Sequence, residues 1–131
     1  LENGQVQSAV VAYKKAVELA PKEALILAGY GRALLSQGTR SGDKLALDVL
    51  RQARDKDPRD AQMLRDLALA WAKAGNNGMA SLITAERYAL LTQFQDAYTN
   101  AVRAEGLLPP GSSGWLQAQD MIAATKTALK K

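Results

Sequence analysis

One pattern of small and bulky residues occurs three times along this 131-residue chain. An Ala is followed four residues later by a bulky or second small residue, then after three residues by another Ala, and after five more by a Pro. The copies are Ala9, Tyr13, Ala16 and Pro21; Ala46, Leu50, Ala53 and Pro58; and Ala97, Ala101, Ala104 and Pro109. Because spacings of four and three place side chains on one face of a helix, the pattern predicts repeated helices.

A second pattern, with bulky and small residues at spacings of three, one and three, precedes the Ala pattern. It comprises Leu27, Tyr30, Gly31 and Leu34, and again Leu64, Leu67, Ala68 and Trp71. Together the two patterns describe helix hairpins. Small residues such as Gly31 let antiparallel helices approach closely, while large ones such as Leu50 fill the grooves between turns. Each hairpin has two apolar sides and is therefore expected to stack on another.

The sequence predicts an all-α protein of seven helices and no strand. We expect the helices at 4–19, 22–37, 43–56, 59–74, 79–92, 94–107 and 114–129. Each Pro is expected at the start of the following helix, with Asp57 as an N-cap before Pro58. Gly38 and the segment 74–78 (AGNNG) are expected to end helices in the left-handed conformation. The helix expected from Met79 begins earlier than the repeat spacing predicts. We therefore expect it to be the second helix of one hairpin and the first helix of the next.

The charge and composition exclude several classes of site. The 17 Lys and Arg are interspersed with 13 Asp and Glu, giving a net charge of +4 on what we interpret as a solvated surface. The sequence contains no Cys and no His, which excludes disulfides, thiolate nucleophiles and imidazole metal ligands. No apolar run approaches the roughly 18 residues of a membrane span, so we predict a soluble, folded chain without a direct membrane span.

Residues 1–111 resemble tetratricopeptide (TPR) repeats, more closely in the first half than after Gly78. The interval from Pro21 to Pro58 exceeds the family's period of about 34 residues by three. We expect the extra residues in the turn SQGTRSGDK, between two helices. The resemblance implies antiparallel hairpins stacked as a short right-handed superhelix. It also predicts two parts, with TPR-like repeats at 1–111, the first one truncated, and a capping helix at 112–131 on the same domain.

The segment from Ala80 to Met121 is similar to the closing segment of bacterial zinc metallopeptidases of peptidase family 48, the Oma-like enzymes with a C-terminal TPR region. The resemblance rests on Ala85, Glu86 and Tyr88, and on Leu108, Pro109, Gly111, Ser112, Trp115, Leu116, Ala118, Gln119 and Asp120. Thr92 and Gln93 depart from it, because the family's turn there usually offers a Gly. The resemblance implies a periplasmic or membrane-associated protein, with zinc bound only in a separate catalytic domain. Its zinc site needs a His-Glu-x-x-His helix, so no catalytic, cofactor or metal residue is expected in this chain.

Other candidate sites have structural explanations. Asp55, Asp57 and Asp60 are better explained by helix capping and solvation than by metal binding. Ser112 and Ser113 lack a base and fit the start of a helix. Trp71 and Trp115 are expected in the core. What remains is a concave binding groove on the helices at 22–37 and 59–74, formed by Arg32, Leu35, Gln62, Arg65, Asp66, Leu69 and Lys73. Its Arg residues would bond a peptide's carboxylate or carbonyl groups; an ordinary wet surface is the alternative.

Three functional classes follow. The leading one is a non-catalytic protein-interaction module of a zinc metallopeptidase, binding a peptide, a partner protein or its own peptidase domain. The second is a free-standing TPR adaptor or scaffold. A nucleic-acid binder is disfavoured, because most of the seven aromatic residues fall on core positions. The stripe of Val10, Tyr13 and Val17 lacks its upstream partner helix in this interpretation, so it is expected to mediate self-association.

Overall fold

The computed structural model describes residues 3–131; Leu1 and Glu2, the first residues of the predicted repeat region, lie outside the described part. Within that part the chain forms seven α-helices and no strand, which confirms the all-α prediction. The helices are α1 (Asn3–Leu19), α2 (Ala24–Ser36), α3 (Arg40–Lys56), α4 (Ala61–Lys73), α5 (Asn77–Leu90), α6 (Phe94–Leu107) and α7 (Ser113–Leu129). Every predicted helix boundary lies within three residues of the observed one.

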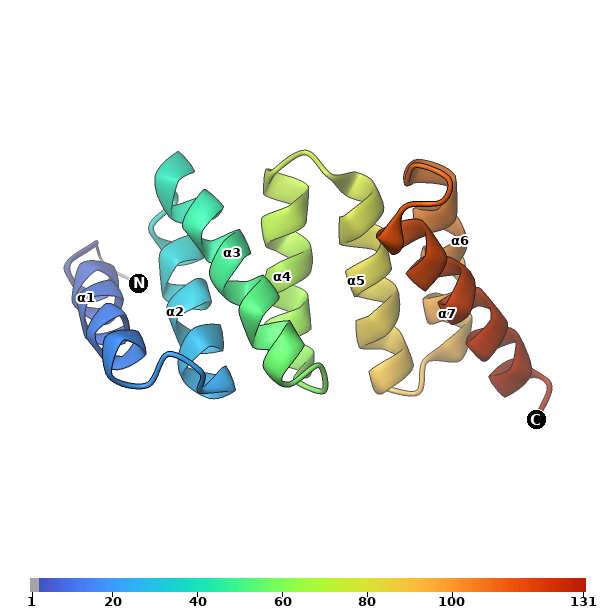
Figure 1. Cartoon of the computed structure of the whole chain (residues 1–131), viewed down its shortest axis with the longest axis horizontal. Helices are drawn as coiled ribbons and strands as arrows, with labels where there is room; N and C mark the ends of the chain where they lie inside the picture. The colour runs from blue at the N-terminus through green and yellow to red at the C-terminus, as the bar shows by residue number, and fades with distance from the viewer. Residues whose placement is uncertain (1–2) are drawn as a thin grey trace. The chain divides into compact units, whose positions relative to one another are not determined.

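The chain divides into two compact units, Leu1–Ala70 and Trp71–Lys131, and the boundary falls near the end of α4. In the first unit, α1 packs on α2 and α2 packs on α3 (Figure 1). In the second unit, α5 packs on α6 and α6 on α7, while α7 also contacts α5. Short turns connect these helices, so successive helices run antiparallel. The predicted division at residue 111 stays a prediction.

The core of the first unit contains the alternation of small and large residues that the sequence predicts. Leu27 and Leu34 of α2 are buried, as are Leu50 and the two flanking Ala residues of α3. Gly31 lies directly against Leu50: a methyl group on Gly31 would overlap Leu50 Cγ and lie 2.6 Å from Cδ2. The absence of a side chain at Gly31 therefore sets how closely α2 and α3 approach.

The apolar stripe of α1 has its partner in α2. Val6 is buried, and Val10 and Val17 are half-buried. The ring of Tyr13 lies over Gly29 of α2, where an added methyl group would come 2.6 Å from Cζ. Within the stripe expected to lack an upstream partner, α2 covers part of each side chain, and Tyr13 is still 37% exposed. Self-association through α1 stays a prediction, and its most exposed apolar side chains are Val11 and Leu19.

The connections on either side of α3 differ from prediction in two ways. Thr39 caps α3 by accepting a hydrogen bond from the Gly42 amide at 3.0 Å, so the helix begins at Arg40. Three residues assigned to the turn, 40–42, therefore extend α3 instead. After α3, the Asp57 carboxylate accepts from the Arg59 amide, whereas Asp60 accepts from the Met63 amide at 3.1 Å. Asp60, not Asp57, is thus the N-cap of α4, because Pro58 lies before the helix and not in its first turn.

The second unit has a core around Leu108, which follows the end of α6. Leu82, Ala104 and Ala118 are fully buried with it, and Met79 and Trp115 pack against this cluster. Gly78 and Gly114 let the α5 and α7 backbones approach Leu108, because a methyl group at either position would lie within 3.2 Å of its side chain. Trp115 and Trp71, both expected in the core, are only partly buried.

The α7 helix contacts α5 and α6. Ala118 and Thr125 are buried and Ile122 is half-buried, whereas Leu129 at the end of the helix is exposed. Ser112 caps the helix by accepting a hydrogen bond from the Trp115 amide at 3.3 Å, which confirms the interpretation of the serine pair as a helix start. The cap position of Ser112 fixes where α7 begins.

The turn between α5 and α6 holds a residue in an unfavourable backbone conformation. Thr92 has φ of 60°, the left-handed region that Gly38 and Gly75 occupy at the ends of α2 and α4. The two glycines confirm the predicted helix stops. A β-branched residue pays a steric penalty in this region that Gly does not. Thr92 is therefore a strained position, at the point where the resembled family usually offers Gly.

Candidate functional site

The predicted groove residues on α2 and α4 lie in the first unit, with one exception. Arg32, Gln62 and Arg65 are exposed, whereas Leu35 and Asp66 are half-buried. Leu69 is 48% exposed, which is high for a leucine in a helix. Gln62, Asp66 and Leu69 follow one another by four and three residues, so they share a face of α4. We call the six residues Arg32, Leu35, Gln62, Arg65, Asp66 and Leu69 the α2/α4 face.

Lys73, the seventh predicted residue, follows the unit boundary at Ala70. It lies in the last turn of α4, one turn beyond Leu69. The structure does not place it with the α2/α4 face, so its membership of a groove stays a prediction.

The Asp66 carboxyl group on this face has a shifted pKa. Burial raises the pKa of Asp66 above its usual value and outweighs the opposing influences. Those opposing influences are the positive charge of Arg32, a hydrogen bond from the Gln62 side chain, and the charge of Arg65; the Asp60 charge adds to the increase. Arg32 belongs to α2 and Asp66 to α4, so a charge on one helix influences the pKa of a carboxyl group on the other.

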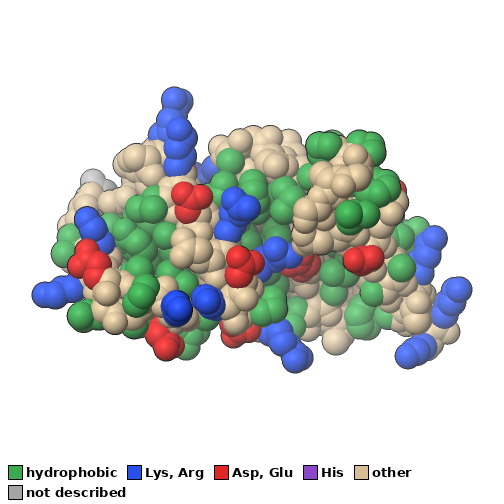
Figure 2. Space-filling view, in the orientation of Figure 1, with side chains coloured by type: hydrophobic (Ala, Val, Ile, Leu, Met, Phe, Trp, Pro, Cys, Tyr) green, Lys and Arg blue, Asp and Glu red, His purple; other side chains and the backbone are tan. Residues whose placement is uncertain are grey.

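The surface of the first unit carries charges of both signs. On the side of that unit seen in Figure 2, Lys and Arg side chains alternate with Asp and Glu side chains and form no patch of one sign. This confirms the dispersed charge expected from the sequence. Any charge selectivity of the α2/α4 face must therefore come from local geometry and not from a large field.

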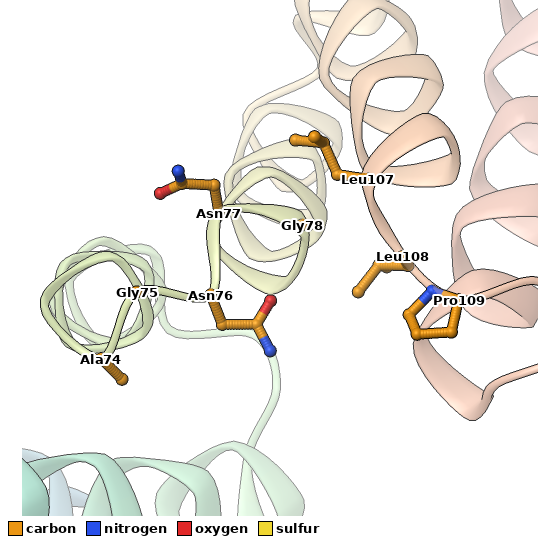
Figure 3. A pocket seen from close by; sticks show the side chains of 8 residues that line it. All are labelled: Ala74, Gly75, Asn76, Asn77, Gly78, Leu107, Leu108 and Pro109. Atoms are coloured by element: carbon orange, nitrogen blue, oxygen red, sulfur yellow. The ribbon is translucent and has the colours of Figure 1, made fainter.

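A hollow lies in the second unit, at the start of α5 and the end of α6. It has a volume of about 430 Å³ and is lined by Ala74, Gly75, Asn76, Asn77, Gly78, Leu107, Leu108 and Pro109. In Figure 3 the side chains of Asn76 and Leu108 point toward one another across it, while that of Asn77 points away. Asn76 accepts a hydrogen bond from the Met79 amide at 2.9 Å, so its oxygen serves as the cap of α5. The lining contains no ionisable side chain, which gives this hollow little chemistry of its own.

The predicted acidic and serine clusters have structural roles. Asp57 and Asp60 accept backbone hydrogen bonds, and Ser112 caps α7. Among residues 3–131 no three His, Cys, Asp or Glu side chains are grouped so that they could hold a metal ion. No helix in the described part is both long and apolar enough to cross a membrane.

Comparison of the sequence with models of known protein families gives no match, and a search of curated proteins finds no similar sequence. The resemblances to TPR repeats and to the peptidase family therefore stay hypotheses drawn from the residues.

Sequence reasoning missed two features of the candidate sites. It did not single out Leu25, which begins the exposed side of α2 and is 78% exposed. Its spacing of seven residues from Arg32, two helical turns, was the available signal. It also treated 74–78 only as a helix stop and did not predict the hollow beside it, because Leu107 and Leu108 lie about thirty residues away in sequence and only the packed helices bring them there.

Proposed function

We propose that this chain is a protein-protein interaction module, without catalytic activity of its own, that binds a peptide or partner protein on the α2/α4 face. The observation that carries the proposal is the exposed Leu69 on the same helix as the exposed Gln62 and Arg65, with the exposed Arg32 of α2 close enough to influence the pKa of Asp66. Exposed Arg side chains next to an exposed aliphatic residue suit a peptide better than they suit a small apolar ligand.

The repeated hairpin pattern supports a TPR-like architecture for this function. In the proposed arrangement, the hairpins stack as a short right-handed superhelix and α7 covers its C-terminal end. The packing of Gly31 against Leu50 and of α7 on α5 and α6 is compatible with that arrangement. Stacked hairpins present successive helices to a ligand, which is how solenoids form extended binding surfaces.

The similarity of residues 80–121 to family 48 peptidases extends the proposal to a biological context. There the module would belong to a periplasmic or membrane-associated zinc metallopeptidase, and zinc would be bound by a catalytic domain outside this chain. The ligand would then be a substrate, a partner complex or that enzyme's own peptidase domain. The second candidate is a free-standing TPR adaptor, and the gene sequence upstream of Leu1 distinguishes the two.

Selection of binding peptides from a random phage-displayed library, followed by calorimetric titration, tests the binding function. We expect selected peptides to bind the chain and to bind R32E/R65E more weakly, with the double variant still folded by circular dichroism because both side chains are exposed. The matched control is R40E/K44E, two exposed charge reversals on α3. Failure to select any binding peptide, or equal losses in both double variants, would contradict binding at this face.

A further inference from the structure

The Asn77–Gly78 step at the start of α5 joins an amide side chain to an unhindered backbone nitrogen. Asn77 is exposed, and its side chain points away from the hollow (Figure 3). Gly78 has no side chain to shield its own nitrogen. As the second residue of α5, it also carries one of the first four N–H groups of the helix, which have no intrahelical acceptor. The amide carbon of Asn77 and a free nucleophilic nitrogen are therefore neighbours in the chain.

The reaction open to such a step is deamidation. The Gly78 nitrogen attacks Cγ of Asn77, the new C–N bond closes a five-membered succinimide ring, and the bond from Cγ to Nδ2 breaks. Ammonia leaves and takes up the proton lost from the Gly78 nitrogen. Water then opens the ring at either of its two carbonyl groups, which gives aspartate or isoaspartate at position 77. The overall reaction consumes one water and releases one ammonia, without oxidation or reduction.

Packing around Gly78 opposes the first of these steps. Attack requires the Asn77 backbone to rotate out of the helical conformation, which would move Gly78 from its place against Leu108. The fit there is close, because a methyl group on Gly78 would lie 2.8 Å from both Cγ and Cδ2 of Leu108. The turn is also closed by Asn76, whose Oδ1 accepts a hydrogen bond from the Met79 amide at 2.9 Å. The reaction therefore has to wait for local opening of the first turn of α5.

The same packing explains why the susceptible sequence is present. A residue larger than Gly at position 78 would displace the side chain of Leu108 or the backbone of α5. Leu108 belongs to the buried cluster of the second unit. The core thus requires at position 78 the one residue that leaves its nitrogen open to attack.

We propose that Asn77 is a site of spontaneous deamidation, and that the contact of Gly78 with Leu108 sets its rate by holding the first turn of α5 closed. The two products have opposite consequences. Aspartate at position 77 places a negative charge at the N-terminus of α5, which the helix dipole favours. Isoaspartate adds a methylene group to the backbone, so the turn can no longer close with Gly78 against Leu108. A transient opening is thereby converted into a lasting loss of packing in the second unit.

Two further Asn residues serve as comparisons within the chain. Asn3 is also followed by Gly, at the start of α1, but a methyl group on Gly4 would meet no described atom within 4 Å. Asn100 lies inside α6, donates through Nδ2 to the Asp96 carbonyl at 2.9 Å, and precedes Ala101. The step at Asn3 therefore has the reactive sequence without the protecting contact, whereas the step at Asn100 has a hindered nitrogen within a helix.

The test is incubation of the full chain at mildly alkaline pH, followed by trypsin digestion and mass spectrometry with fragmentation that distinguishes aspartate from isoaspartate. Trypsin releases Asn77 in the peptide 74–87, and the same synthetic peptide gives the unprotected rate. We expect Asn77 to deamidate at least about tenfold more slowly in the chain than in the peptide, because the turn must first open. Asn3 should deamidate within about threefold of its rate in synthetic peptide 1–14. Asn100 should stay unmodified.

Two variants open the turn by different routes. L108V shortens the side chain that lies on Gly78, and N76A removes the hydrogen bond to the Met79 amide. We expect each to raise the rate at Asn77 about fivefold, relative to peptides that carry the same sequence at 74–87. The matched control N76S keeps an oxygen acceptor at the cap and should leave the rate unchanged, as should all three variants at Asn3. Circular dichroism shows that each variant is folded.

The consequence for packing is measured on the products. The purified isoaspartyl chain should melt at a lower temperature than the unmodified chain, whereas N77D should melt at the same temperature or higher. Deamidation of Asn77 as fast in the folded chain as in the peptide would overturn the inference, and so would an unchanged rate in both L108V and N76A. An isoaspartyl chain as stable as the unmodified one would overturn the assigned loss of packing.

Discussion

The close contact between Gly31 and Leu50 gives a quantitative test of how α2 and α3 pack. Substituting Gly31 with Ala adds a methyl group that would overlap Leu50 Cγ, while Leu50 itself is fully buried. Overpacking of this kind costs about 1–3 kcal/mol. The better helix propensity of Ala returns about 1 kcal/mol. We therefore expect G31A to lower the free energy of unfolding by up to about 2 kcal/mol.

The double variant isolates the contact from these other effects. L50A alone leaves a cavity in a closed core and should cost about 3–4 kcal/mol. In G31A/L50A the new methyl group occupies part of that cavity, so the combined loss should be smaller than the sum of the single losses by about 1–3 kcal/mol. Urea unfolding followed by circular dichroism measures each value, provided that the m-values agree.

The control is G106A, at an exposed helical glycine where an added methyl group meets nothing within 4 Å. It should raise the free energy of unfolding by about 0.5–1 kcal/mol through helix propensity alone. If G31A stabilises as G106A does, or if the double variant is additive within about 0.5 kcal/mol, the proposed close approach of α2 and α3 is refuted.

Three further predictions concern the turn, the second core and the buried acid. T92G should raise the free energy of unfolding by about 0.5–1 kcal/mol, because removing the steric strain of a non-Gly residue at positive φ outweighs the entropic cost of Gly. The control T99G, in the middle of α6, should lower the free energy of unfolding slightly in the same urea titration. L108A should cost about 2–4 kcal/mol and open protease sites near Gly111, and should cost more than W115A because Leu108 is buried and Trp115 only partly so; the reverse order would contradict the assigned core. Burial holds the pKa of Asp66 above its unfolded value, so its contribution to stability is greatest below the unfolded pKa and falls as pH rises through the folded pKa. As pH rises through that range, we therefore expect D66N to become more stable than the natural chain, whereas D48N should not. Thermal melts at several pH values measure this. A melting temperature of D66N that falls relative to that of the natural chain as pH rises would contradict the prediction.

Helix positions and much of the core were predictable because both follow from local spacing. Ala46, Leu50 and Ala53 recur at helical intervals and are all buried, since the side chains that repeat on one face are those that pack. Gly38 and Gly75 were predictable as stops for the same local reason, namely that glycine has no steric penalty at positive φ.

Features that depend on three-dimensional packing could not be predicted in the same way. The spacing of Tyr13 predicts an apolar stripe but does not identify its neighbours, and the structure places its ring over Gly29 of α2 with 37% of the residue still exposed. The assignment of the α4 cap to Asp57 assumed that Pro58 begins the helix, but the chain turns once more before Asp60. For the α2/α4 face, sequence spacing identified the residues, whereas the partial burial of Asp66 could be found only from the folded chain.

Thr92 and Asp66 are two positions where the chain holds a residue that stability alone would not select. Thr92 adopts φ of 60° in an exposed turn, and its hydroxyl donates only to the adjacent Leu91 carbonyl at 2.6 Å, so nothing around it suggests a ligand. Asp66 differs because its destabilising burial occurs among Arg32, Gln62 and Arg65, which are exposed and chemically able to bind a peptide. Ionisable groups that oppose folding and lie among such neighbours are characteristic of functional sites. Binding at the α2/α4 face, as proposed, would give the half-buried Asp66 a role, whereas the strain at Thr92 has no such neighbours.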